Sequence, residues 1–216
     1  MISNIRPLLL LFPAIALLAS SVAAHAESPA FEITPFVGAR MGGGFDLTNP
    51  EGNDSSVDLD SGISYGIDLG MYRDSQSFYE LLYSTQQTSL DSADPALDGV
   101  DLRIHYLQFG GTAFFPQDND RFVPYLSLTL GATFMDPDYG GYDSETKFSG
   151  SLGGGFRIPF NDNVALNLGV RGYLTLIESD TSLFCVSDAE QAGCLLRSSG
   201  STFFQAEGQI GVSVRF

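Results

Sequence analysis

The last segment of the chain alternates strictly between two kinds of residue. From Phe204 to Phe216 every even position is apolar or glycine, and every odd position is polar or glycine. Side chains point alternately to the two faces of a β-strand, so a period of two predicts a strand with one apolar face. The segment from Val164 to Leu176 has the same pattern, and no charge falls on the apolar face of either segment.

Six earlier segments have a related pattern and bring the predicted strands to eight. They span residues 31–44, 63–71, 79–84, 100–115, 125–134 and 147–158. The segment 100–115 does not keep one phase, because Leu102, Ile104 and Tyr106 fit one register whereas Leu107 and Phe109 fit the other. We interpret this as a β-bulge near Tyr106, or as a strand that leaves the membrane there.

The connections between these segments are of two lengths. Links 73–76, 116–121 and 159–163 are short, whereas links 46–60, 89–99, 136–144 and 178–199 are longer and acidic. Short turns at one end and long loops at the other are typical of an outer-membrane barrel with both termini in the periplasm. The predicted fold is all-β, an eight-stranded antiparallel up-and-down transmembrane β-barrel.

The first 26 residues have the three parts of a cleavable export signal. Arg6 lies in the short first part, an apolar run follows it, and the small-residue ending Ala24-His25-Ala26 comes after the run. A retained membrane helix is disfavoured, because Pro7 and Pro13 interrupt a run that is already short for spanning a bilayer. We therefore expect a signal peptide at 1–26 and a barrel domain at 27–216.

Charge excludes one class of partner. Without the signal the chain has nine basic and 26 acidic residues, a formal charge of −17. Binding of nucleic acid needs clustered cations to neutralise phosphates, so no nucleic-acid partner is expected.

The polar faces of the strands carry balanced charges. A soluble, lipocalin-like barrel would turn these faces outward, whereas a membrane barrel encloses them, and an enclosed charge needs a partner because an unpaired one costs several kcal/mol. The export signal, the loop asymmetry and the charge balance favour the membrane. We expect the lumen to be filled by paired side chains, the alternative being a gated conduit for small solutes. The expected lumen charges are Glu32, Arg40, Asp68, Glu80, Arg157, Arg171, Glu207 and Arg215.

Aromatic residues are expected at the strand ends, in the two girdles typical of membrane barrels. One set comprises Phe31, Phe78, Tyr79, Phe115, Phe122, Phe160 and Phe216, and the other comprises Phe45, Tyr83, Phe134, Tyr139, Tyr142, Phe148 and Phe204.

The longest link contains the two cysteines, Cys185 and Cys194. An exported chain meets an oxidising compartment, so we predict a disulfide rather than a metal site. The acidic loops are expected to be solvated, with divalent bridging to lipopolysaccharide or weak calcium binding as the alternative, since none of them has the spacing of a dedicated calcium loop. No metal or cofactor is predicted.

The layout resembles the family of small outer-membrane β-barrel domains, in the superfamily of the OmpA transmembrane domain, OmpX and OmpW. The resemblance covers residues 31–216 and depends on the glycine-rich segment 150–157, the segment 169–173 and the terminal Phe216. It implies a monomer in the Gram-negative outer membrane that contacts lipid and lipopolysaccharide. It also implies that the C-terminal strand, with Phe216 as the assembly signal, meets the barrel-assembly machinery. Similarity to OmpW implies a narrow pore for small or apolar solutes as the second function.

Enzyme activity is the rival class and is not predicted. Acyl-transfer or hydrolytic chemistry needs a base beside a nucleophile, and His105 is the only histidine after the predicted signal. No nucleophile can be assigned near it. We therefore expect a structural or surface-interaction protein, and a lipid A-modifying enzyme is the least favoured alternative.

Overall fold

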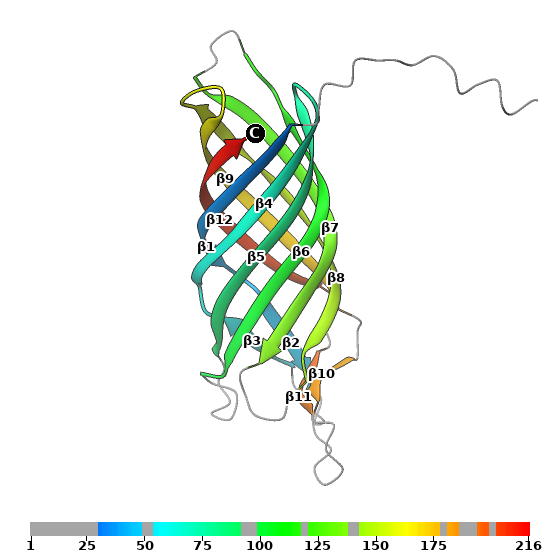
Figure 1. Ribbon diagram of the computed structural model, residues 1–216. Coiled ribbons are helices and arrows are strands. Elements are labelled where there is room, and N and C mark those ends of the chain that lie inside the picture. Colours follow the sequence, from blue (N-terminus) through cyan, green and yellow to red (C-terminus); the bar gives the residue numbers. More distant parts are fainter. Residues whose placement is uncertain are drawn as a thin grey trace, which may run out of the picture.

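The computed structural model describes residues 30–48, 54–91, 99–117, 121–137, 143–177, 181–185, 194–198 and 202–216, which form strands and turns but no helix. Figure 1 shows a single barrel with steeply inclined strands. Its eight strands are β1 (Phe31–Met41), β4 (Gly62–Asp74), β5 (Ser77–Asp91), β6 (Asp101–Phe114), β7 (Val123–Pro137), β8 (Glu145–Pro159), β9 (Val164–Leu176) and β12 (Thr202–Arg215). Among the described residues there is no helix long and apolar enough to cross a membrane.

The barrel is closed, as the sequence predicts. Each of the eight strands pairs antiparallel with the next one along the chain, and β12 returns to pair with β1 from Glu32↔Arg215 to Met41↔Ala206. Backbone hydrogen bonds between Phe31 and Phe216, at 2.9 and 3.3 Å, complete this seam. Closure leaves no unpaired strand edge, which a strand exposed to lipid could not tolerate.

The two ends of the barrel differ. The turns β4–β5, β6–β7 and β8–β9 lie at the same end as the start of β1 and the end of β12 (Figure 1, top). At the opposite end two hairpins extend the wall, β2 (Gly44–Thr48) with β3 (Asp54–Leu59), and β10 (Thr181–Cys185) with β11 (Cys194–Ser198). Two of the four predicted long loops therefore contain strands of their own. We call the two ends the turn end and the loop end.

The outer wall is apolar, in agreement with the predicted faces. The large hydrophobic side chains that project from the barrel include Ile63, Leu128, Leu152 and Val170, which are 57–70% exposed. This surface is far larger than a water-soluble protein tolerates, and it matches the lipid-facing band of a membrane barrel.

Strand β6 does not contain the predicted bulge. Its pairing with β5 and β7 runs without a register shift, and Leu102, Ile104 and Tyr106 all point inward and are at most 1% exposed, whereas Leu107 and Phe109 point outward. The alternation of inward and outward side chains is therefore constant along β6. What changes is the lumen, which is polar at one end of the strand and apolar at the other. Apolar residues appear on both faces of β6 because the lumen at the loop end is itself apolar.

Exposed aromatic side chains surround the turn end. They are Phe31, Tyr79, Phe115, Phe122, Phe160 and Phe216. Tyr83, Phe134, Phe148 and Phe204 are exposed nearer the loop end. Phe78 was wrongly assigned to the girdle, because it packs inside the barrel against Tyr72 and Phe114 with ring centroids 5.5 and 5.4 Å away. The other predicted members, Phe45, Tyr139 and Tyr142, lie outside the described side chains.

Candidate functional site: the barrel lumen

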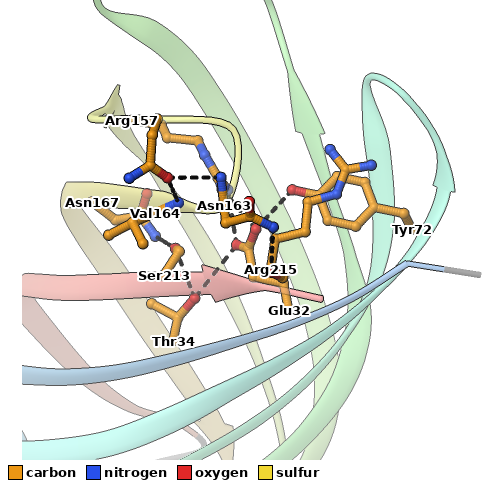
Figure 2. Close-up of polar contacts among 10 residues, drawn as sticks. Glu32, Thr34, Tyr72, Arg157, Asn163, Val164, Asn167, Ser213 and Arg215 are labelled. Atoms are coloured by element: carbon orange, nitrogen blue, oxygen red, sulfur yellow. Dashed lines mark hydrogen bonds and ion pairs between the residues drawn. The ribbon is translucent and has the colours of Figure 1, made fainter.

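The first layer of the lumen, at the turn end, is built around Glu32. Arg157 donates two hydrogen bonds to its carboxylate, at 2.8 and 2.6 Å, and the hydroxyl of Tyr72 donates a third at 2.8 Å. Figure 2 shows this group with Arg215, whose guanidinium lies 4.3 Å from the centre of the Tyr72 ring. The pair joins strands that are not neighbours, because Glu32 is on β1 and Arg157 is on β8, three strands away around the ring.

The second layer is the ion pair between Arg171 and Glu80. Arg171 on β9 donates to Glu80 on β5 at 2.6 Å and to the hydroxyl of Ser151 at 3.0 Å. Gly153 makes room for it: a Cβ at this position would lie 3.3 Å from Nε of Arg171 and 2.6 Å from Oγ of Ser127. The glycine-rich sequence of β8 thus gives one buried arginine the space to cross the lumen.

The third layer contains Arg40 and Glu207, both fully buried. Nε of Arg40 donates to Glu207 at 2.7 Å, and Nη2 contacts the same carboxylate oxygen and the hydroxyl of Ser84. The guanidinium lies 5.0 Å from the ring centre of Tyr106 and 4.7 Å from that of Tyr173, and these two rings are stacked at 4.3 Å. A cation held against two aromatic rings and a carboxylate is strongly attached to its position.

An apolar cluster fills the loop end of the lumen, beyond the third layer. Its members there are Leu59, Leu90, Val100, Leu102, Ile104, Met135, Ile177 and Phe203, all buried, together with Tyr106 and Tyr173. Phe36 and Leu82 belong to the same cluster but lie nearer the second layer. Sequence reasoning missed this cluster because it assumed a polar interior throughout. The pattern that could have revealed it is the change of apolar face along residues 102–109, since Leu102, Ile104 and Tyr106 lie on one face and Leu107 and Phe109 on the other.

The barrel that encloses this lumen was compared with known protein families. The chain matches the family described as "Outer membrane protein beta-barrel domain" over residues 12–216. This protein belongs to that family. No match exists among curated proteins.

Solved structures show the same fold at low sequence identity. Neisserial surface protein A (NspA) is 16% identical with a TM-score of 0.55, over 87% of this chain and 97% of its own. The outer membrane protein OprG from Pseudomonas aeruginosa is 15% identical with a TM-score of 0.56, over 87% and 96%. The outer membrane protein AlkL is 13% identical with a TM-score of 0.54, over 87% and 90%. The family consists of outer-membrane barrels, and at these identities the likeness concerns the fold alone.

Six of the eight lumen charges in this family member form pairs, and two do not. Among the described residues, Asp68 and Arg215 have no ion-pair partner within 4.0 Å. Arg215 stacks on Tyr72 at the mouth, whereas Oδ1 of Asp68 is buried without a hydrogen-bond partner.

Other residues considered from the sequence lie away from the lumen. His105 is part-buried on β6, and its Nδ1 lies 3.0 Å from the hydroxyl of Tyr83. The aromatic and imidazole rings are stacked at 6.0 Å. Phe216 is 66% exposed at the end of the seam between β12 and β1.

The loop end contains the remaining sites. Cys185 and Cys194 are register partners in the β10–β11 hairpin, but their side chains lie outside the described residues, so the disulfide stays a prediction. Most of the loop acids are also outside the described side chains. Within the described part of the chain, no three histidine, cysteine or acidic residues are grouped as a metal site.

Proposed function

We propose that this protein is a closed, monomeric, non-enzymatic barrel with a structural or surface-interaction role in the outer membrane. Closure is supported by the three ion-paired layers and the apolar cluster, which follow one another along the lumen from the turn end to the loop end. The ion pairs join side chains from different strands, such as Arg157 with Glu32 and Arg171 with Glu80.

Opening such a lumen would have a high free-energy cost. Separating a buried ion pair leaves an uncompensated charge and costs about 3–5 kcal/mol, and a continuous path would need several layers to separate together. Thermal fluctuation does not supply that amount often, so the resting state is shut.

The proposed orientation places the turn end and both termini in the periplasm and the loop end outside the cell. In this orientation the export signal is removed, and Phe216 leads the C-terminal strand to the barrel-assembly machinery. The outer wall then contacts lipid, and the acidic loops with their two hairpins face lipopolysaccharide and external partners. The loop acids are proposed to be solvated, and divalent ions are the means by which they would bridge to anionic lipopolysaccharide.

A narrow pore is the second candidate function, and one feature favours it. At the turn end an open hollow of about 440 Å³ is lined by Tyr72, Phe114, Arg157, Asp162 and Arg215, among other residues. Phe114 and Arg157 also line a smaller cavity deeper in the lumen. A conduit from this end would need the Arg157–Glu32 pair to act as a gate and the apolar cluster to move aside.

Conductance of the refolded barrel in planar bilayers separates the two candidates. The closed barrel should give the baseline of the protein-free bilayer, and a variant with Tyr106→Ala and Tyr173→Ala should show steps if the apolar end is the plug. Glu80→Ala tests the polar layers in the same way. Reproducible steps from the unmodified protein would overturn closure in favour of the pore.

The absence of catalysis is tested separately. Replacing His105→Ala should leave the mass profile of lipid A unchanged in cells that express the barrel, because the hydrogen bond of His105 is with the hydroxyl of Tyr83 on the outer wall. An altered acylation pattern would indicate a lipid A-modifying enzyme instead.

A further inference from the structure

The open hollow at the turn end contains one cation and one anion that have no ion-pair partner. They are Arg215 on β12 and Asp162 on the turn between β8 and β9, and no partner lies within 4.0 Å of either among the described residues. Arg157, which also lines the hollow, is paired with Glu32. The two unpaired side chains thus face one space of about 440 Å³ without neutralising each other directly.

The first described residue of the chain lies at the rim of this hollow. The carbonyl of Ala30 accepts a hydrogen bond from the backbone N–H of Tyr72 at 2.9 Å, and the ring of Tyr72 lines the hollow and stacks against Arg215. The β8–β9 turn is attached at the same place, because the backbone N–H of Arg215 donates to the carbonyl of Asn163 at 2.8 Å and Nδ2 of Asn163 donates to the carbonyl of Arg215 at 2.9 Å (Figure 2).

The chain that precedes Ala30 is long enough to enter the hollow. Cleavage before Glu27 leaves residues 27–29 in front of Ala30, and three extended residues span about 10 Å. Only β12 separates β1 from β9, so the β8–β9 turn lies about two strand spacings, ~10 Å, from the start of β1. Pro29 restricts the conformations of the segment, which lowers the entropy lost when the segment docks.

We infer that residues 27–29 of the processed chain dock in the hollow, with the α-ammonium of Glu27 on Asp162 and the side-chain carboxylate of Glu27 on Arg215. This inference rests on the signal cleavage that is part of the proposed function, because the α-ammonium exists only after cleavage. One residue supplies both charges, so the net charge of the hollow does not change. Each ion pair is weak by itself, but attachment at Ala30 gives the segment an effective concentration in the millimolar range, so the two contacts act together.

Docking covers the hollow from which a conduit at the turn end would start. Removal of the signal therefore also closes the mouth of the lumen, in addition to the ion-paired layers behind it. The uncleaved chain has the carboxylate of Glu27 but not the cation that pairs with Asp162, so it lacks half of the contact.

The test measures how fast phenylglyoxal, a reagent for accessible guanidinium groups, modifies Arg215. The chain is produced behind a fusion partner whose proteolytic removal leaves Glu27 as the first residue, is refolded in detergent micelles, and is compared with a chain that begins at Ala30. Arg215 should react about fivefold more slowly in the longer chain, because two weak ion pairs cover it for most of the time. Arg73, whose side chain is 68% exposed, should react at the same rate in both chains. Peptide mass spectrometry measures the modification of each arginine.

Variants assign the protection to the two ion pairs. Glu27→Gln removes the carboxylate and Asp162→Asn removes the partner of the ammonium, so each should raise the rate for Arg215 toward that of the shortened chain. An additional methionine before Glu27 moves the α-ammonium by one residue and should have the same effect. Asp101→Asn, which removes the same charge from an exposed site at the loop end, is the control and should retain the protection. Equal rates in the longer and shortened chains, or full protection in Glu27→Gln, would overturn the inference.

The cleavage is tested separately, by the mass of the protein isolated from outer membranes. A first residue other than Glu27 would refute that part of the proposed function, whereas the refolded chains still decide whether residues 27–29 dock.

Discussion

The Arg40–Glu207 pair is the part of the lumen where sequence changes should have the clearest energetic consequence. Both side chains are fully buried, and each has one atom without a partner among the described residues, Nη1 of Arg40 and Oε1 of Glu207. Replacing Arg40→Met alone leaves Glu207 as a buried, unpaired carboxylate, and Glu207→Leu alone leaves the arginine. Each single change should lower the free energy of unfolding by about 3–5 kcal/mol. Arg40→Met also loses the contacts with Tyr106 and Tyr173, so its loss of unfolding free energy should lie toward the upper end of this range.

The double variant should be much less destabilised than the sum of the two single changes. It contains no buried charge at this layer, and its apolar side chains would extend the cluster that already packs on Tyr106 and Tyr173. Buried pairs whose remaining polar atoms are unsatisfied are often replaced by apolar residues at no cost. We therefore expect a favourable coupling energy of about 3 kcal/mol or more between the two positions.

Urea unfolding of the refolded barrel in lipid vesicles measures these values. The chain has no tryptophan, so circular dichroism or gel mobility must report the transition. Arg73→Ala is the control, because Arg73 and Asp74 form an exposed pair at 4.0 Å that should contribute nothing measurable. Single variants that lose less than about 1 kcal/mol, or a double variant that loses the sum, would refute the argument that buried charge dominates this layer.

Three further predictions concern other parts of the chain. Deletion of Phe216 should reduce the yield of folded barrel in the outer membrane of cells, measured by heat-modifiable mobility of membrane fractions; an unchanged yield would remove Phe216 as the assembly signal. Gly153→Leu should force Arg171 from its position and cost about 2 kcal/mol or more in urea unfolding, whereas Gly208→Leu, where a Cβ would meet nothing within 4 Å, should disturb no lumen residue. The protein should migrate faster on non-reducing than on reducing denaturing gels because of a Cys185–Cys194 bond, and a variant with both cysteines replaced by serine should lose this difference; a free-thiol count of two in the unmodified protein would contradict the pairing.

Much of the fold could be predicted from the sequence, because a strand in a barrel wall obeys one local rule. In β9 and β12 the apolar residues face lipid and the polar residues face the lumen. Alternation identified the strands and divided each into two faces, and the export signal, the loop asymmetry and the charge balance then indicated which face meets lipid. The lengths of the links then fixed the up-and-down order, since short turns can join only neighbouring antiparallel strands.

The interior could be predicted only in part. The sequence identified the eight inward charges, but pairing is a matter of which residues meet across the lumen, and Arg157 reaches Glu32 over 125 positions of sequence. The strand β6 was misread for the same reason. Whether Leu102 and Ile104 contact lipid or other lumen residues depends on Met135 from the neighbouring β7, on Phe203 from β12 and on the rest of the cluster.

The sequence by itself therefore determined the strands, the two faces of each and the order in which they join, because alternation and turn length act between neighbouring residues. Its export signal, loop asymmetry and charge balance indicated which face meets lipid. The tertiary structure alone decided that the loop end of the lumen is apolar, which charges form pairs, and that Asp68 is the acid left over beside a cavity. These properties depend on the stagger of strands around a closed ring, where side chains from opposite arcs share one narrow space.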